Sequence, residues 1–162
     1  MRMADVAEGR SMDRIIHIHA RLNSSARKAF EMFTQSAALQ SWLAPLAEVS
    51  PTVGGKYELF WEPGERQHNS TLGCRITALE EGRFLSFEWR GPRQFEQFMN
   101  TADPLTHVVV FFIPGGEGAE VWTDVYLIHS GWRSTSEWEQ ARQWFDEAWS
   151  TAFTELSRQV NG

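Results

Sequence analysis

The sequence has little cysteine, which excludes one way of stabilising a small domain. Cys74 is the only cysteine among 162 residues, so no disulfide can form within the chain. It lies in a strand-like stretch, where we expect a buried and unreactive thiol. A chain without a disulfide framework is typical of a reducing compartment, and we expect a cytoplasmic protein.

Long hydrophobic runs and clustered positive charge are also missing. The longest fully apolar stretch, residues 108–113, is far shorter than the roughly 20 residues that a transmembrane helix needs. The first residues carry charges instead of an apolar segment, so no signal peptide is predicted. The net charge is −6 and the arginines are scattered along the chain. Neither a nucleic acid nor a membrane is therefore expected as a partner.

Aromatic side chains are plentiful. They make up 13% of the chain, with eight Trp and eleven Phe, and such rings fill a core or line an apolar cavity. The length corresponds to one domain. Residues 1–12 show no periodicity and are expected to form a disordered tail, so the predicted domain covers residues 13–160.

A long amphipathic helix is predicted within residues 132–156. Ser134 with Glu137, or Ser136 with Glu139, would form a capping box at its start. Apolar residues then recur at steps of three and four, which indicates one buried helix face: Trp138, Ala141, Phe145, Ala148, Trp149, Ala152 and Leu156.

The chain before this helix alternates between apolar and polar residues, which predicts short strands. Turn residues separate these strands, and capping residues after the first strand indicate two short helices. The expected strands are 14–20, 49–52, 56–61, 72–79, 84–90, 106–113 and 119–129, and the expected short helices are 26–34 and 37–42. This order predicts an α+β fold in which about seven antiparallel strands curve around the last helix.

Several stretches in this order resemble the helix-grip superfamily, also called SRPBCC or START-like (Bet v 1-like), and within it the heat-shock-protein-90 ATPase activator homologue group. The stretches that carry the resemblance are residues 24–30, 39–43, 53–57, 73–79, 85–89 and 125–132. They span nearly the whole chain, and their order and spacing make the match. The resemblance implies a curved sheet that grips the C-terminal helix, often with a cavity between them.

The sheet face that would point at the helix supplies the candidate ligand-binding residues. From the strands they are Tyr57, Trp61, Phe87, Trp89, Val125 and His129. From the helix they are Trp138, Phe145 and Trp149. The same rings could instead meet and fill the core. His129 is the polar member, and a ligand, a backbone group or a buried water could each satisfy it.

The connection between residues 91 and 104 lacks periodicity and carries Phe95, Phe98 and Met99. Loops of this length in small domains often cover a binding site. We consider these three residues candidate lid residues. Burial against the core, or against a partner subunit, remains open for them.

Two outer-face features suggest other roles. His17 and His19 share a strand face, but no third ligand is apparent, so no metal site is predicted and both should face solvent. Trp122, Tyr126 and Ile128 would form an exposed apolar stripe on the last strand, which favours a homodimer.

The favoured function is binding of a small apolar or aromatic molecule between sheet and helix, without a cofactor. A second hypothesis, implied by the resemblance, is a co-chaperone-like domain that contacts a chaperone. A third is a cyclase- or hydrolase-like enzyme with His129 or a strand carboxylate as base. No nucleophile motif occurs, so we assign no catalytic residue.

Overall fold

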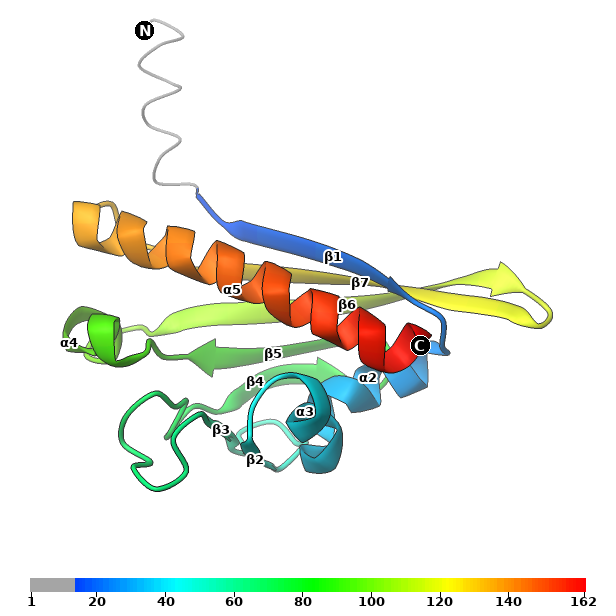
Figure 1. Ribbon diagram of the computed structural model, residues 1–162, viewed down its shortest axis with the longest axis horizontal. Helices are drawn as coiled ribbons and strands as arrows, with labels where there is room; N and C mark the ends of the chain where they lie inside the picture. The colour runs from blue at the N-terminus through cyan, green and yellow to red at the C-terminus, as the bar shows by residue number, and fades with distance from the viewer. Residues whose placement is uncertain (1–13) are drawn as a thin grey trace, which may run out of the picture.

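The computed structural model describes residues 14–162, so the predicted tail at residues 1–12 lies outside the described residues. The predicted α+β fold is confirmed: a curved antiparallel sheet lies against one long C-terminal helix (Figure 1). The strands are β1 (Ile16–Leu22), β2 (Leu46–Val49), β3 (Tyr57–Phe60), β4 (Ile76–Glu80), β5 (Phe84–Trp89), β6 (Thr106–Glu117) and β7 (Glu120–Ser130).

Five strands form the main sheet in the order β1-β7-β6-β5-β4, and β2 pairs with β3. An antiparallel bridge between Lys56 and Arg75 joins this pair to β4. The Tyr57 N–H also donates to the Cys74 carbonyl at 2.8 Å. The seven strands therefore form one curved surface.

Two short helices, α2 (Ala26–Thr34) and α3 (Ser36–Trp42), follow β1 as the capping signals predict. The Ser25 side chain caps α2 by accepting the Lys28 N–H. Phe30 and Phe33 on α2 are buried against Phe112 of β6, with ring centroids 5.5 Å apart in both pairs. The two helices thus close one end of the domain.

The long helix α5 (Ser136–Asn161) crosses the concave side of the sheet (Figure 1). Its buried residues are Trp138, Ala141, Phe145, Trp149, Phe153 and Leu156. The predicted stripe omitted Phe153 and included Ala148 and Ala152, which are only half-buried. No helix within residues 14–162 is both long and apolar enough to cross a membrane.

The start of α5 corrects the predicted caps. Neither Ser134 nor Ser136 caps the helix; Thr135 does, and its hydroxyl accepts the Trp138 N–H at 3.3 Å. Glu139 instead binds Arg142 and Arg14. The one-residue offset reflects three consecutive hydroxyl side chains that all suit an N-cap.

Replacing the true cap should destabilise the protein. We expect Thr135→Ala to lower the free energy of unfolding by about 1 kcal/mol, because one helix N–H loses its acceptor. Ser134→Ala and Ser136→Ala are the matched controls and should be nearly neutral. Urea denaturation measures all three, and equal effects at the three positions would refute the assignment.

The connection between β5 and β6 is more ordered than its sequence suggests. It contains a 3-10 helix, η2 (Arg93–Phe95), and a helical turn, α4 (Glu96–Met99). The Asn100 side chain accepts the Gly91 N–H at 2.6 Å and thereby closes the segment on itself. Short segments like these bury too few residues to produce a clear periodicity.

Candidate functional site

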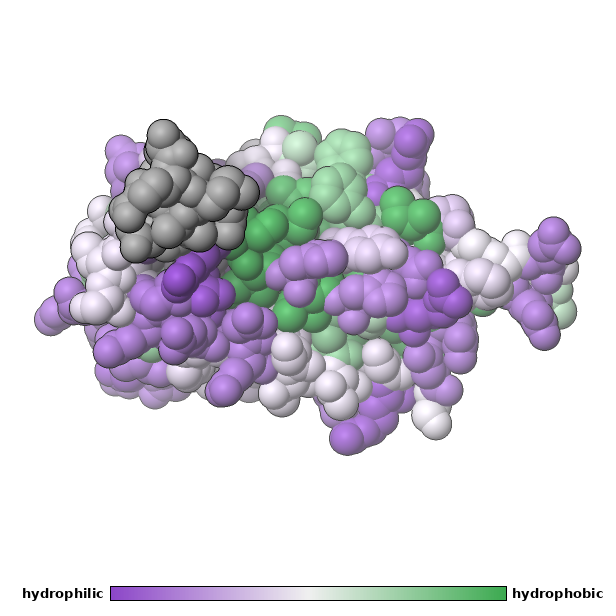
Figure 2. All heavy atoms as spheres, turned by 90° about the horizontal axis from the view of Figure 1, so that it is seen from above, coloured by the Kyte–Doolittle hydropathy of each residue, from purple (hydrophilic) through white to green (hydrophobic). Residues whose placement is uncertain are grey.

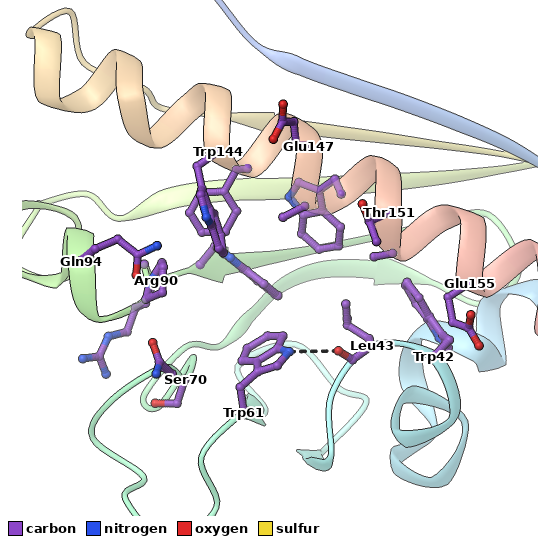
Figure 3. A pocket seen from close by; sticks show the side chains of 18 residues that line it. Trp42, Leu43, Trp61, Ser70, Arg90, Gln94, Trp144, Glu147, Thr151 and Glu155 are labelled. Carbon is purple, nitrogen blue, oxygen red and sulfur yellow. Dashed lines mark hydrogen bonds between the residues drawn. The ribbon is translucent and has the colours of Figure 1, made fainter.

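A pocket of about 820 Å³ opens along the side of α5. Its walls are the end of β5, the end of α3 with the residue after it, the loop after β3 and the segment after β5 (Figure 3). The aromatic lining residues are Trp42, Trp61, Trp89, Trp144, Phe145 and Trp149. Five of the eight tryptophans of the chain therefore meet at one cavity.

These rings hold one another in place. Trp89 packs 5.1 Å from Trp149 and 6.0 Å from Trp61 between ring centroids. The Trp61 indole N–H donates to the Leu43 carbonyl at 3.0 Å, as the dashed line in Figure 3 marks. Even so, Trp61 keeps 37% of its surface exposed and Trp144 keeps 40%. The pocket thus presents apolar rings that the protein itself does not cover.

Polar side chains line the same pocket. They include Ser70, Arg90, Gln94, Glu147, Thr151 and Glu155. Figure 3 places Ser70, Arg90 and Gln94 at one side of the cavity, while Glu147, Thr151 and Glu155 project from α5. An apolar body with few polar positions is typical of small-molecule sites.

Ion pairs fasten the loop after β3 to the segment after β5. The Arg93 Nε donates to Glu62 at 2.8 Å, and a second guanidinium nitrogen binds Glu65. The Arg93 guanidinium lowers the pKa of the Glu62 carboxyl below its usual value. The His68 ring contacts the Glu96 carboxylate at 2.9 Å. These contacts hold together the wall that contains Asn69, Ser70 and Gln94.

The predicted cavity residues fall into two groups. Trp61, Trp89, Phe145 and Trp149 line the pocket. The others, which are Tyr57, Phe87, Val125, His129 and Trp138, are buried in the packed core. For this second group the space between sheet and helix is filled by the side chains themselves.

Tyr57 illustrates this filling. Its ring stacks on Phe87 with centroids 3.9 Å apart, and its hydroxyl donates to the Phe33 carbonyl at 2.7 Å. Complete burial raises the pKa of the Tyr57 hydroxyl. Tyr57 therefore ties β3 to α2 and does not face the pocket.

His129 is sealed inside the domain. The Trp149 indole N–H donates to His129 Nδ1 at 3.1 Å, so Nδ1 is the unprotonated nitrogen. Nε2 then carries the proton and contacts the Thr106 hydroxyl at 3.0 Å. Burial lowers the pKa of His129 to about 3. Two side chains thus satisfy a neutral imidazole, and this histidine does not line the pocket.

The three candidate lid residues contact α5 or the core. Phe95 packs 5.9 Å from Trp144, and Phe98 packs 5.1 Å from Trp138, between ring centroids. Met99 is buried. None of the three lines the pocket, whereas their neighbour Gln94 does.

Sequence reasoning missed several lining residues, among them Trp42, Arg90, Gln94 and Trp144. On α5 the missed positions Trp144, Thr151 and Glu155 have a common cause, since together with Ala148 of the predicted stripe they form a second stripe beside the buried one. Spacings of three and four from Trp144 contain this signal. The cavity candidates predicted on α5 came from the buried stripe only, so they did not include the side chains of this second stripe.

The remaining candidates lie away from the pocket. His17 and His19 are exposed, as predicted, and His19 contacts Asp124 at 2.9 Å. Within residues 14–162 no group of three potential metal ligands comes together. Cys74 is buried as predicted, and burial raises the pKa of its thiol.

Known proteins resemble this chain over most of its length. The family model described as "Activator of Hsp90 ATPase homolog 1-like protein" matches residues 23–161. No curated protein sequence matches the chain significantly. Many solved structures are similar, among them three whose matches each cover 91% of this chain.

The first is a protein from Mesorhizobium loti with a TM-score of 0.71, 19% identity and 97% of its own length covered. The second is the Aha1 dimer from Colwellia psychrerythraea, with a TM-score of 0.65, 14% identity and 96% covered. The third is an HSP90 activator from Plasmodium falciparum, with a TM-score of 0.65, 18% identity and 96% covered. At these identities the similarity establishes the shared fold.

Proposed function

The chain belongs to the family of Activator of Hsp90 ATPase homolog 1-like proteins, and on that premise we propose that its pocket binds a small apolar or aromatic molecule. The observation that carries the proposal is the cavity of about 820 Å³ lined by five tryptophans. Pockets for drug-sized ligands enclose roughly 300–1,000 Å³ and are mostly apolar.

The exposed surface of Trp61 and Trp144 supports the proposal further. A planar or hydrophobic ligand would cover both rings and gain about 25 cal/mol for each Å² of apolar surface removed from water. The rings are already held by Leu43 and by Phe95, respectively, so little side-chain entropy is lost on binding. In this proposal the segment with Phe95, Phe98 and Met99 acts as a lid that α5 anchors.

A fluorescent neutral probe tests the proposal. N-phenyl-1-naphthylamine becomes bright in apolar surroundings, so titration with the purified protein should give a saturable signal with one site per chain. Native mass spectrometry of the freshly purified protein should also show a mass in excess of the chain. A signal that rises without saturation, together with an unmodified mass, would contradict the proposal.

A second function rests on the family itself. The description of the family, and the HSP90 activator from Plasmodium falciparum, support a co-chaperone-like role. Under this alternative the protein should be retained by the chaperone from the same cell and should raise its rate of ATP hydrolysis. A protein that binds the naphthylamine probe but leaves that rate unchanged would have the first function alone.

We further propose a homodimer through the outer face of the sheet, for which the Aha1 dimer is the precedent. Phe111 pairs with Tyr126 across β6 and β7, beside exposed Ile113 and half-buried Ile128. Trp122, the third member of the predicted stripe, lies half-buried under the Arg21 guanidinium. Figure 2 looks onto α5 and the β1 edge of the sheet, not onto this outer face; hydrophobic residues gather in the middle of that view, and the β6–β7 hairpin projects at one end.

Charge on this face should break the dimer. We expect the wild-type protein to sediment as a dimer and Phe111→Asp to sediment as a monomer, because a carboxylate would be buried without a partner. Val53→Asp is the matched control, since Val53 is equally apolar and 66% exposed outside this face. Analytical ultracentrifugation measures the oligomeric state of all three proteins, and a monomeric wild type would contradict the proposed dimer.

A further inference from the structure

The polar groups of the pocket are divided by charge. Arg90 and the uncharged Ser70 and Gln94 lie at one side, whereas Glu147 and Glu155 project from α5 (Figure 3). Glu155 is paired with Arg158 at 2.9 Å. Arg90 is therefore the charged residue at its side of the pocket, and the carboxylates belong to the α5 side, where Figure 3 shows the Glu147 carboxylate directed away from the cavity.

Arg90 is the group whose bonding is incomplete. Its Nη1 donates to the Leu72 carbonyl at 2.6 Å. Its Nε is buried and has no hydrogen-bond partner within residues 14–162, and no carboxylate among these residues forms an ion pair with the guanidinium. A buried donor without an acceptor is costly, and structures rarely leave one without a reason.

The neighbouring arginine shows the contrast. Arg93 lies on the same segment, and two carboxylates, Glu62 and Glu65, saturate its guanidinium. Arg93 therefore has a structural task in fastening the wall. Arg90 lines the pocket, and no carboxylate in the described part of the chain pairs with it, so the two arginines have different roles although they are three positions apart.

We propose that the ligand carries one anionic group, a carboxylate or a similar oxyanion, that pairs with Arg90 while its apolar body lies among the tryptophans. This inference rests on the proposed binding function and specifies the ligand class. A guanidinium matches an oxyanion with paired N–H donors, which gives direction as well as affinity.

Three ligands with one ring system test the charge preference. They are 1-naphthaleneacetate, its neutral amide 1-naphthaleneacetamide, and the cation 2-(1-naphthyl)ethylamine, each measured by displacement of N-phenyl-1-naphthylamine. The acetate should displace the probe about tenfold better than the amide, as expected for a hydrogen bond to a charged group. The amine should be the weakest of the three.

Variants of Arg90 assign the preference to this side chain. Arg90→Met should abolish the advantage of the acetate and leave displacement by the amide nearly unchanged. Arg90→Lys should retain part of the advantage, and it keeps the test valid if the methionine variant folds poorly. Arg83→Met is the control, because Arg83 is an exposed arginine in the β4–β5 turn.

The outcomes separate this inference from the proposed function. Failure of the probe to bind at all would refute the binding function. Probe binding with equal displacement by acetate and amide, or an acetate advantage that survives in Arg90→Met, would refute the role of Arg90 only. Preference for the amine would assign the ligand contact to Glu147 and Glu155 and would overturn the inference.

Discussion

Lowering the pH from about 7 to about 4 is expected to cost the protein about 3 kcal/mol of stability through His129 alone. The folded protein holds this imidazole neutral, with its pKa lowered from 6.5 to about 3 by burial. At pH values between these two pKa values, the unfolded chain therefore binds a proton at His129 that the folded chain does not bind. The stabilisation is fully present above the unfolded pKa and is lost as the pH falls toward the folded pKa.

Urea denaturation at several pH values measures this loss. In His129→Gln the free energy of unfolding should be lower at neutral pH, because Trp149 and Thr106 lose well-placed partners, but it should depend less on pH. His17→Gln removes an exposed histidine instead of the buried one and is the control substitution. Parallel pH profiles for wild type and His129→Gln would contradict the account of the buried imidazole.

Asp124 should add to the acid sensitivity at lower pH. Hydrogen bonds from Arg21 and His19 lower the pKa of its carboxyl to about 2. A carboxyl with a depressed pKa stabilises the fold above its unfolded pKa and loses that contribution as pH falls. The free energy of unfolding thus falls with falling pH, as it does for His129, but over a lower pH range.

Filling the pocket should weaken binding without unfolding the protein. Ala152 lines the pocket on α5, and Ala152→Trp places an indole where the ligand would lie. We expect the affinity for N-phenyl-1-naphthylamine to fall by about tenfold or more, which corresponds to at least about 1.4 kcal/mol. Helix propensity changes by less than about 1 kcal/mol, so the fold should persist.

Gln143→Trp is the matched control for this variant. Gln143 is an exposed residue on the same helix and does not line the pocket. Its substitution adds the same indole to α5, and the affinity should remain that of the wild type. If both variants bind the probe normally, the probe occupies another part of the surface.

The sequence predicted the architecture well because each element carries a local signal. β7 alternates between buried and half-buried residues along its inner half, and Ser25 caps α2. The predicted N-cap of α5 was wrong by one residue, because Ser134, Thr135 and Ser136 each carry a hydroxyl oxygen that could cap the helix. Local chemistry thus fixes which elements form, and tertiary contacts select among equivalent caps.

The site was harder to predict, because the position of a cavity depends on how completely the side chains of the sheet and of α5 fill the space between these two elements. Tyr57 and Phe87 stack closely enough to leave no room, and His129 finds both of its partners inside the domain. Neither contact follows from strand periodicity. The cavity instead lies beside α5, where Trp144 and Arg90 come from segments far apart in the chain.

The indole N–H signals of the tryptophans test the central claim most directly. In a ¹H–¹⁵N spectrum the eight tryptophans should give eight indole signals, assigned by single Trp→Phe variants. Addition of 1-naphthaleneacetamide should shift the signals of Trp42, Trp61, Trp89, Trp144 and Trp149, which line the pocket. Trp122, on the outer face of the sheet, should remain in place. Shifts confined to Trp122, or no shift at saturating ligand, would contradict a binding pocket beside α5.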